Sequence, residues 1–108
     1  MISINILVGI IYIFSGLILF KYPPKKINYV YGYRTRNSKS TQKKWDFAQT
    51  YSAKELMTQG AILLIIGIVS YILNIKESFE IGFGLVLMSL SMILIFYKTE
   101  KAIKKIEE

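Results

Sequence analysis

The sequence predicts an all-α integral membrane protein with three transmembrane helices and a basic, partly amphipathic-helical cytoplasmic loop between the first and the second. Of its 108 residues, 53% are hydrophobic, and the apolar residues are concentrated in three blocks without charged side chains. Each block is close to the length of about 18 residues or more that indicates a helix crossing a bilayer. Three segments are too few for a closed barrel, so helices must pair the backbone groups inside lipid. We expect a single membrane domain, residues 1–108.

The first apolar block runs from Ile4 to Phe20 and predicts a transmembrane helix at about residues 4–22. A signal peptide is the alternative. However, no Lys or Arg precedes the apolar core, and the segment continues into KYPPKK rather than into small residues around a cleavage site. We therefore expect the segment to be retained. Pro23 and Pro24 should end the helix, because neither has an N–H to donate.

A polar and aromatic stretch follows, and we assign residues 23–54 to the loop with an interfacial helix. Ser40 or Thr41 can cap the N-terminus of this helix, which should run on into the second span. The pattern is amphipathic. It predicts Trp45 as an aromatic anchor at the membrane surface and Gln49 in polar surroundings.

The second and third apolar blocks should form a helical hairpin, with spans at about residues 55–75 and 80–98, because only residues 76–80 separate them. Residues 99–108 should form a cytoplasmic tail that is helical and solvated. Small residues recur at a spacing of seven in all three spans, which places each pair on one helix face. The pairs are Gly9 and Gly16, Gly60 and Gly67, Gly82 and Ser89, and Gly84 and Ser91. They indicate close helix packing or, as the alternative, a hollow for a substrate or an inserted peptide.

Basic residues determine the expected orientation. Most of the basic residues behind the formal charge of +7 lie between the first two spans or after the third, whereas the hairpin turn carries only Lys76. The positive-inside rule then places the N-terminus outside and the C-terminus in the cytoplasm. Because basic flanks also attract anionic lipid, the charge requires no nucleic acid, and the expected partner is the lipid bilayer.

Reactive side chains are scarce. The chain has no Cys and no His, so we expect no metal and no cofactor. The only acids between the first two spans are Asp46 and Glu55, which a helix would hold about 13 Å apart. We therefore expect no enzymatic activity. Asp46 should either pair with Arg34 or Arg36 or remain solvated. The absence of charge within the three apolar blocks also argues against an ion-coupled transporter.

The pattern P-P-x-x-x-N-x-x-x-G-Y-R-T, followed by Ser and W-x-x-A, resembles the SdpI family of bacterial membrane proteins. The matching positions are Pro23, Pro24, Asn28, Gly32, Tyr33, Arg34, Thr35, Ser38, Trp45, Ala48, Ala53 and Lys54. The resemblance covers the core region, from about Tyr22 to the end of the third span. Ala53 occupies a place where members of the family often have Gly.

The resemblance implies a multi-pass protein of the bacterial cytoplasmic (inner) membrane that confers resistance to a secreted, membrane-active peptide toxin by binding it. The founding member of that family also holds a transcriptional repressor at the membrane, which the resemblance implies as a second role. We expect the binding residues in the loop, namely Gly32, Tyr33, Arg34, Thr35, Ser38, Trp45, Asp46 and Tyr51.

The residues leave two questions open. The Arg34 guanidinium is suited to binding a carboxylate or phosphate, or alternatively to tying down its own loop. A small membrane transporter or an assembly partner of another membrane protein is the alternative function. We also expect a homodimer with the glycine faces as candidate contacts, because three helices bury little surface.

Overall fold

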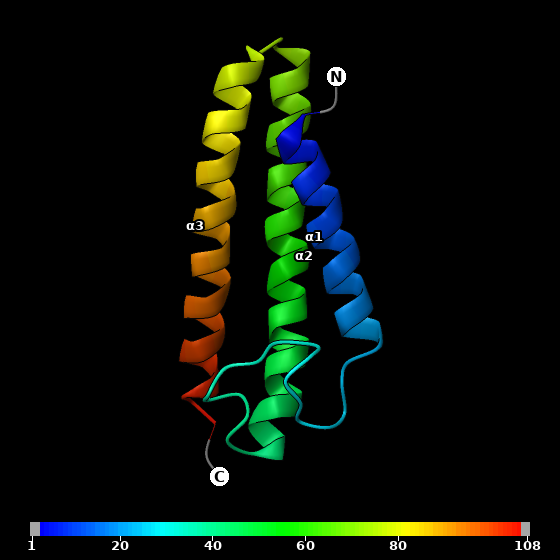
Figure 1. The fold of residues 1–108 in the computed structure, drawn as a ribbon, viewed down its shortest axis with the longest axis vertical. Coiled ribbons are helices and arrows are strands. Elements are labelled where there is room, and N and C mark those ends of the chain that lie inside the picture. The colour runs from blue at the N-terminus through cyan, green and yellow to red at the C-terminus, as the bar shows by residue number, and fades with distance from the viewer. Residues whose placement is uncertain (1–2, 107–108) are drawn as a thin grey trace.

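The computed structural model describes residues 3–106 as three helices, α1 (Ile4–Lys21), α2 (Gln42–Ile72) and α3 (Glu77–Ile103) (Figure 1). The described part contains no strand, and it is elongated, measuring 51 × 23 × 19 Å. Each helix is long and apolar enough to cross a membrane. The all-helical prediction with three such helices is therefore confirmed.

Large apolar side chains cover the outside of the bundle. Phe14, Ile65 and Ile93, one on each helix, are 60%, 62% and 64% exposed. In water such an exposed apolar surface would make molecules associate. Against lipid tails, which are as apolar as the side chains, it would not. The distribution of apolar groups is thus that of a multi-pass membrane protein.

The two ends of the bundle differ. At the turn end, residues 73–76 join α2 to α3, and Asn74 adopts a left-handed conformation with φ of 54°. At the basic end, α1 ends, α3 ends and α2 begins (Figure 1). A helix of 31 residues is about 46 Å long, so α2 extends beyond an apolar core of roughly 30 Å.

The expected helix after Thr41 runs on into the second span as one continuous helix, α2. Thr41 caps α2, and its Oγ1 accepts a hydrogen bond from the Lys44 N–H at 3.1 Å. Trp45 is fully buried, so the expectation of an aromatic anchor at the membrane surface is wrong. Residues 99–103 continue α3, and Ile103 is buried against Tyr33 and Ala48. Residues 107 and 108 of the expected tail lie outside the described residues.

The main helix contact joins α1 to α2 through glycine. A Cβ at Gly9 would lie 2.7 Å from the Leu64 nitrogen and 2.8 Å from the Gly60 oxygen, and one at Gly67 would lie 2.6 Å from the Ile6 nitrogen. No side chain fits at these positions unless the backbones move apart. Gly16 meets Ala53 and Met57 in the same way. The predicted close packing is confirmed for these two faces, and both are covered within one chain.

The two small-residue faces of α3 behave differently. Gly84 packs against Ile4 and Asn5, and Ser91 shares a 2.9 Å hydrogen bond with the Tyr12 hydroxyl, so this face meets α1. By contrast, nothing lies within 4 Å of a Cβ built at Gly82, and the exposed Ser89 donates to Leu85 of its own helix. The expectation that Gly82 and Ser89 mark a packed face is wrong within this chain.

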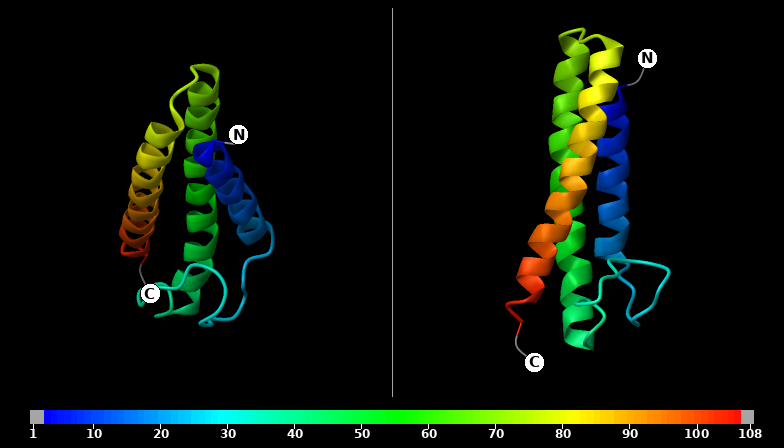
Figure 2. Two further views of the ribbon diagram at one scale, coloured as in Figure 1. Left: turned by 45° about the horizontal axis from the view of Figure 1, so that its top comes forward. Right: turned by 60° about the vertical axis from the view of Figure 1, so that its left-hand side comes forward.

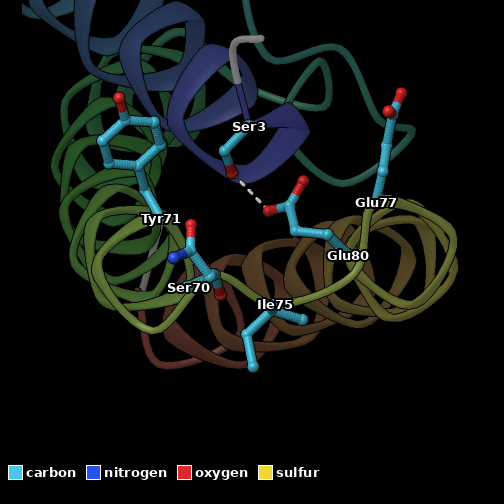
Figure 3. Close-up of a pocket in the computed structure, with 7 residues that line it drawn as sticks. Ser3, Ser70, Tyr71, Ile75, Glu77 and Glu80 are labelled. Carbon is cyan, nitrogen blue, oxygen red and sulfur yellow. Dashed lines mark hydrogen bonds between the residues drawn. The ribbon is translucent and has the colours of Figure 1, made fainter.

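At the turn end, a carboxylate of α3 caps the first helix. Glu80 is 6% exposed, and it accepts hydrogen bonds from the Ile4 N–H at 2.9 Å and the Asn5 side-chain amide at 2.8 Å. Ser3 also donates to it, whereas Glu77 points away (Figure 3). A negative charge at a helix N-terminus is stabilising because it satisfies N–H groups that lack a helical partner. The adjacent pocket, lined by Ser70 and Tyr71 among others, measures about 210 Å³.

We predict that Gly9→Ala destabilises the bundle by about 1–3 kcal/mol, because the added methyl group meets the backbone of α2. Gly82→Ala is the matched control, and it should stabilise the protein slightly, since Ala favours helix over Gly by about 1 kcal/mol. Denaturant unfolding in detergent micelles, followed by the fluorescence of Trp45, measures both. Equal stability changes for the two variants would contradict the packing.

We predict that Glu80→Ala lowers the free energy of unfolding by about 1–3 kcal/mol, because buried donors of α1 lose their acceptor. Glu77→Ala, an exposed carboxylate in the same turn, should change it much less. The same unfolding assay tests this difference. If both variants unfold alike, Glu80 does not hold α1.

Candidate functional site

A cavity of about 250 Å³ lies at the basic end, between α1 and α3. These two helices diverge toward that end, and the loop crosses between them (Figure 2). The lining comes from α1, the loop, α2 and α3. It consists of Leu19, Gly32, Tyr33, Arg34, Ser52, Leu56, Met92, Ile95 and Phe96. Because most of these side chains are apolar, the cavity suits an apolar group.

Gln49 of α2 fixes the loop where it meets the cavity. Its Oε1 accepts a hydrogen bond from the Tyr33 N–H at 2.7 Å, and its Nε2 donates to the Tyr33 carbonyl at 2.8 Å. Gly32 has φ of +98°, and a Cβ there would lie 2.4 Å from the same Oε1. Only glycine fits this position. Gln49 is fully buried, so the expectation of polar surroundings for it is wrong.

Glu100 of α3 holds the loop from the other side. Its carboxylate accepts hydrogen bonds from the Tyr33 hydroxyl at 2.6 Å, the Thr35 hydroxyl at 2.8 Å and the Asn37 amide at 2.7 Å. Hydrogen bonds to a charged acceptor are stronger than those between neutral groups. A single carboxylate therefore fixes three loop side chains against the end of α3.

Two further contacts shape the loop itself. Ser38 is fully buried; its Oγ accepts from the Thr35 N–H at 2.8 Å, and the Thr35 Oγ1 accepts from the Ser38 N–H at 3.1 Å. This reciprocal pair closes a tight turn. The Trp45 indole N–H donates to the Pro24 carbonyl at 2.8 Å and ties the start of the loop to α2.

Tyr33 forms part of the cavity wall, and its ring lies 5.4 Å from that of Phe96 between centroids. Burial raises the pKa of its phenol, and the neighbouring Glu100 carboxylate raises that pKa further. The hydroxyl therefore stays protonated at neutral pH and acts as a donor to Glu100.

Arg34 lies at the rim of the cavity and is exposed. Within residues 3–106 its guanidinium has no hydrogen-bond or ion-pair partner. Asp46 is exposed and accepts from the Gln42 amide at 2.8 Å, so of the two alternatives for it the ion pair with Arg34 or Arg36 is not formed. The loop is held by Gln49 and Glu100, and the Arg34 side chain takes no part in holding it.

The structure brings only part of the predicted site together. Gly32, Tyr33 and Arg34 line the cavity, and Thr35 and Ser38 support them from behind. The other three predicted residues lie outside the lining. Trp45 is buried under Pro24, Asp46 is exposed, and Tyr51 stacks on Phe47 with centroids 5.5 Å apart.

Sequence reasoning missed the two residues that hold the loop, Gln49 and Glu100. A signal for Gln49 was its position one turn after Trp45, on the same helix face. Glu100 carried no local signal, because its partners lie more than 60 positions away along the chain.

The chain is similar in sequence to a protein family and to a bacterial relative. Residues 25–98 match the family described as SdpI/YfhL protein family. The chain is also 35% identical over 100 residues to the uncharacterized protein YfhL of Bacillus subtilis (strain 168). The matched region covers 89% of this chain and 82% of that protein. No solved structure matches the chain. The family match includes the loop, α2 and the cavity-lining part of α3, and this chain belongs to the SdpI/YfhL protein family.

Proposed function

We propose that this protein is a bacterial membrane immunity protein that confers resistance to a secreted, membrane-active peptide toxin by binding it. The observation that carries the proposal is the apolar cavity at the basic end with the unpaired Arg34 at its rim. Membership of the SdpI/YfhL family is consistent with it.

The size of the cavity limits what enters it. Sites that enclose a drug-sized molecule measure about 300–1,000 Å³. A volume of about 250 Å³ is smaller and suits one or two apolar side chains. The remainder of a bound peptide would lie along α1 and α3, where exposed apolar side chains such as Phe14 and Ile93 already face lipid. A membrane-active peptide has the apolar surface that this arrangement requires.

The charge at the rim defines the other part of the ligand. A guanidinium offers a rigid fork of donors that matches a carboxylate. Since Arg34 is exposed and unpaired within the described residues, it is open to such a partner. We infer that the terminal carboxylate of the peptide binds Arg34 while a nearby apolar side chain fills the cavity.

Binding without turnover is part of the proposal. Among the described residues, those that line the cavity include no carboxylate, so Ser52 has no general base beside it there. Peptide held in this way is kept from acting on the bilayer by occupancy alone. Protection should therefore be limited by the number of copies of the protein.

The proposed orientation places the basic end in the cytoplasm. The loop and the end of α3 carry most of the basic residues, and the turn end has only Lys76 among the described ones. In the bacterial inner membrane the toxin would then be bound at the level of the inner leaflet, and the N-terminus would lie outside.

We predict that Arg34→Ala reduces protection by about tenfold or more at matched membrane levels, because it removes a charge-assisted contact to the ligand. The assay is survival of a sensitive bacterium exposed to the secreted killing peptide against which the founding family member protects. Arg34→Lys should recover only part of the protection, since an ammonium lacks the planar fork.

Arg36→Ala is the control for the Arg34 variants. Arg36 is exposed in the same loop, carries the same charge and is absent from the cavity lining. It should protect like the wild type. Equal loss of protection in the Arg36 and Arg34 variants would show that protection depends only on the total positive charge of the loop. Absence of protection by the wild type would contradict the proposed function.

We predict that Glu100→Gln weakens protection and loosens the loop, because three donors lose their charged acceptor. Loss of about 1.5–3 kcal/mol should raise the open population of the loop tenfold or more. Limited trypsin digestion of the purified protein measures this as faster cleavage after Arg34 and Arg36.

Lys101→Gln, an exposed change on the next residue of α3, should leave the rate of cleavage unchanged. A Glu100→Gln protein that resists trypsin like the wild type would show that Gln49 alone holds the loop.

A further inference from the structure

Residues 27–31, here called the loop tip, form a hydrogen-bonded turn. The Asn28 Oδ1 accepts hydrogen bonds from the Val30 N–H at 2.9 Å and the Tyr31 N–H at 2.8 Å, and its Nδ2 donates to the Lys26 carbonyl at 2.9 Å. Such Asn-centred turns give a short segment a defined shape. The backbone of the loop tip therefore has a defined shape.

Two side chains of the loop tip are left almost uncovered by the rest of the protein. Tyr29 is 81% exposed and Val30 is 86% exposed, although both are apolar or largely so. A turn that held these side chains for internal packing would cover them. Adjacent exposed apolar side chains on a shaped turn indicate contact with another phase or molecule.

The loop tip lies at the level where the first span ends. The Tyr31 hydroxyl donates to the Tyr22 carbonyl at 2.9 Å, and Tyr22 directly follows the last residue of α1. In one view the loop extends sideways beyond α1 at the basic end (Figure 2). For a helix that crosses a bilayer, this is the headgroup region, where Tyr side chains are favoured.

Within the loop the charge has a single sign, and the acid that approaches it is Asp46 of α2, since the Gln42 amide donates to both Asp46 and the Lys25 carbonyl. Residues 22–41 contain five basic side chains and no acid, namely Lys25, Lys26, Arg34, Arg36 and Lys39. Lys25 and Lys26 are exposed, and the Lys39 ammonium lies 4.1 Å from the centroid of the Tyr29 ring. Positive charge beside inserted apolar side chains complements an anionic membrane surface.

We propose that the loop tip is a docking site for the anionic lipid headgroups of the bilayer that surrounds the helices. Tyr29 and Val30 enter the boundary between headgroups and acyl chains, and Lys25, Lys26 and Lys39 pair with the lipid phosphates. Since Tyr33 and Arg34 follow in the same loop, this contact also steadies the wall of the cavity. The proposal stands independently of toxin binding.

The absence of Cys from the chain makes a direct test available. Val30→Cys, labelled with a fluorophore that responds to polarity, is placed in nanodiscs of phosphatidylcholine with or without phosphatidylglycerol. Nanodiscs expose both faces, so the orientation of the protein does not affect access. Ser40→Cys, exposed near the other end of the loop, is the labelled control.

With phosphatidylglycerol we expect the Val30 label to shift to shorter emission wavelength and to become several-fold less accessible to iodide, while the Ser40 label changes little. Replacement of Lys25, Lys26 and Lys39 by Gln should abolish the difference between the two lipids. Unchanged Trp45 fluorescence shows that this variant is folded. A Val30 label that is equally accessible in both lipids, or equally protected in both, would overturn the proposal.

Discussion

The close approach of α1 and α2 is the constraint on which the rest of the structure depends. Lipid tails are as apolar as leucine, so helices in a membrane gain little by burying apolar area against each other and associate mainly through packing. Gly9, Gly60 and Gly67 allow backbone to meet backbone along the first half of α1, and Gly16 does the same farther along. With this pair fixed, α3 is held at the turn end by Glu80 and farther along by Tyr12.

The divergence of α1 and α3 toward the basic end follows from this asymmetry. There α3 contacts α2 through the 3.5 Å ion pair of Lys98 with Glu55, and the loop lines the cavity that is left between α1 and α3. The loop keeps its shape because two neighbours satisfy its polar groups: Gln49 pairs with its backbone, and Glu100 pairs with its side chains. A cavity with a defined polar rim results.

This division of roles accounts for Arg34. An arginine that holds its own loop is not available to bind a ligand. Here an amide and a carboxylate from α2 and α3 do the holding, so the guanidinium at the rim is free of partners within the described residues. The family match runs from residue 25 to residue 98 and includes the rim, but Glu100 lies just beyond it. The support for the site therefore extends past the part that defines the family.

The sequence by itself determined the local features: the three apolar helices, a cap at Ser40 or Thr41 and the glycine faces of α1 and α2, because each depends on residues within a few turns of one another. Only the tertiary structure decided how the loop is held. Gln49 and Glu100 read as surface residues until the loop folds onto them, and of the two alternatives for Asp46 the arginine pair is not formed, since Asp46 stays exposed and accepts from Gln42. Likewise, Gly82 and Gly84 each precede a serine by seven residues, and only the rotation of α3 about its axis decides that Gly84 is the one that is buried. A periodic pattern defines the faces of a helix, but the position of its neighbours decides which face is covered.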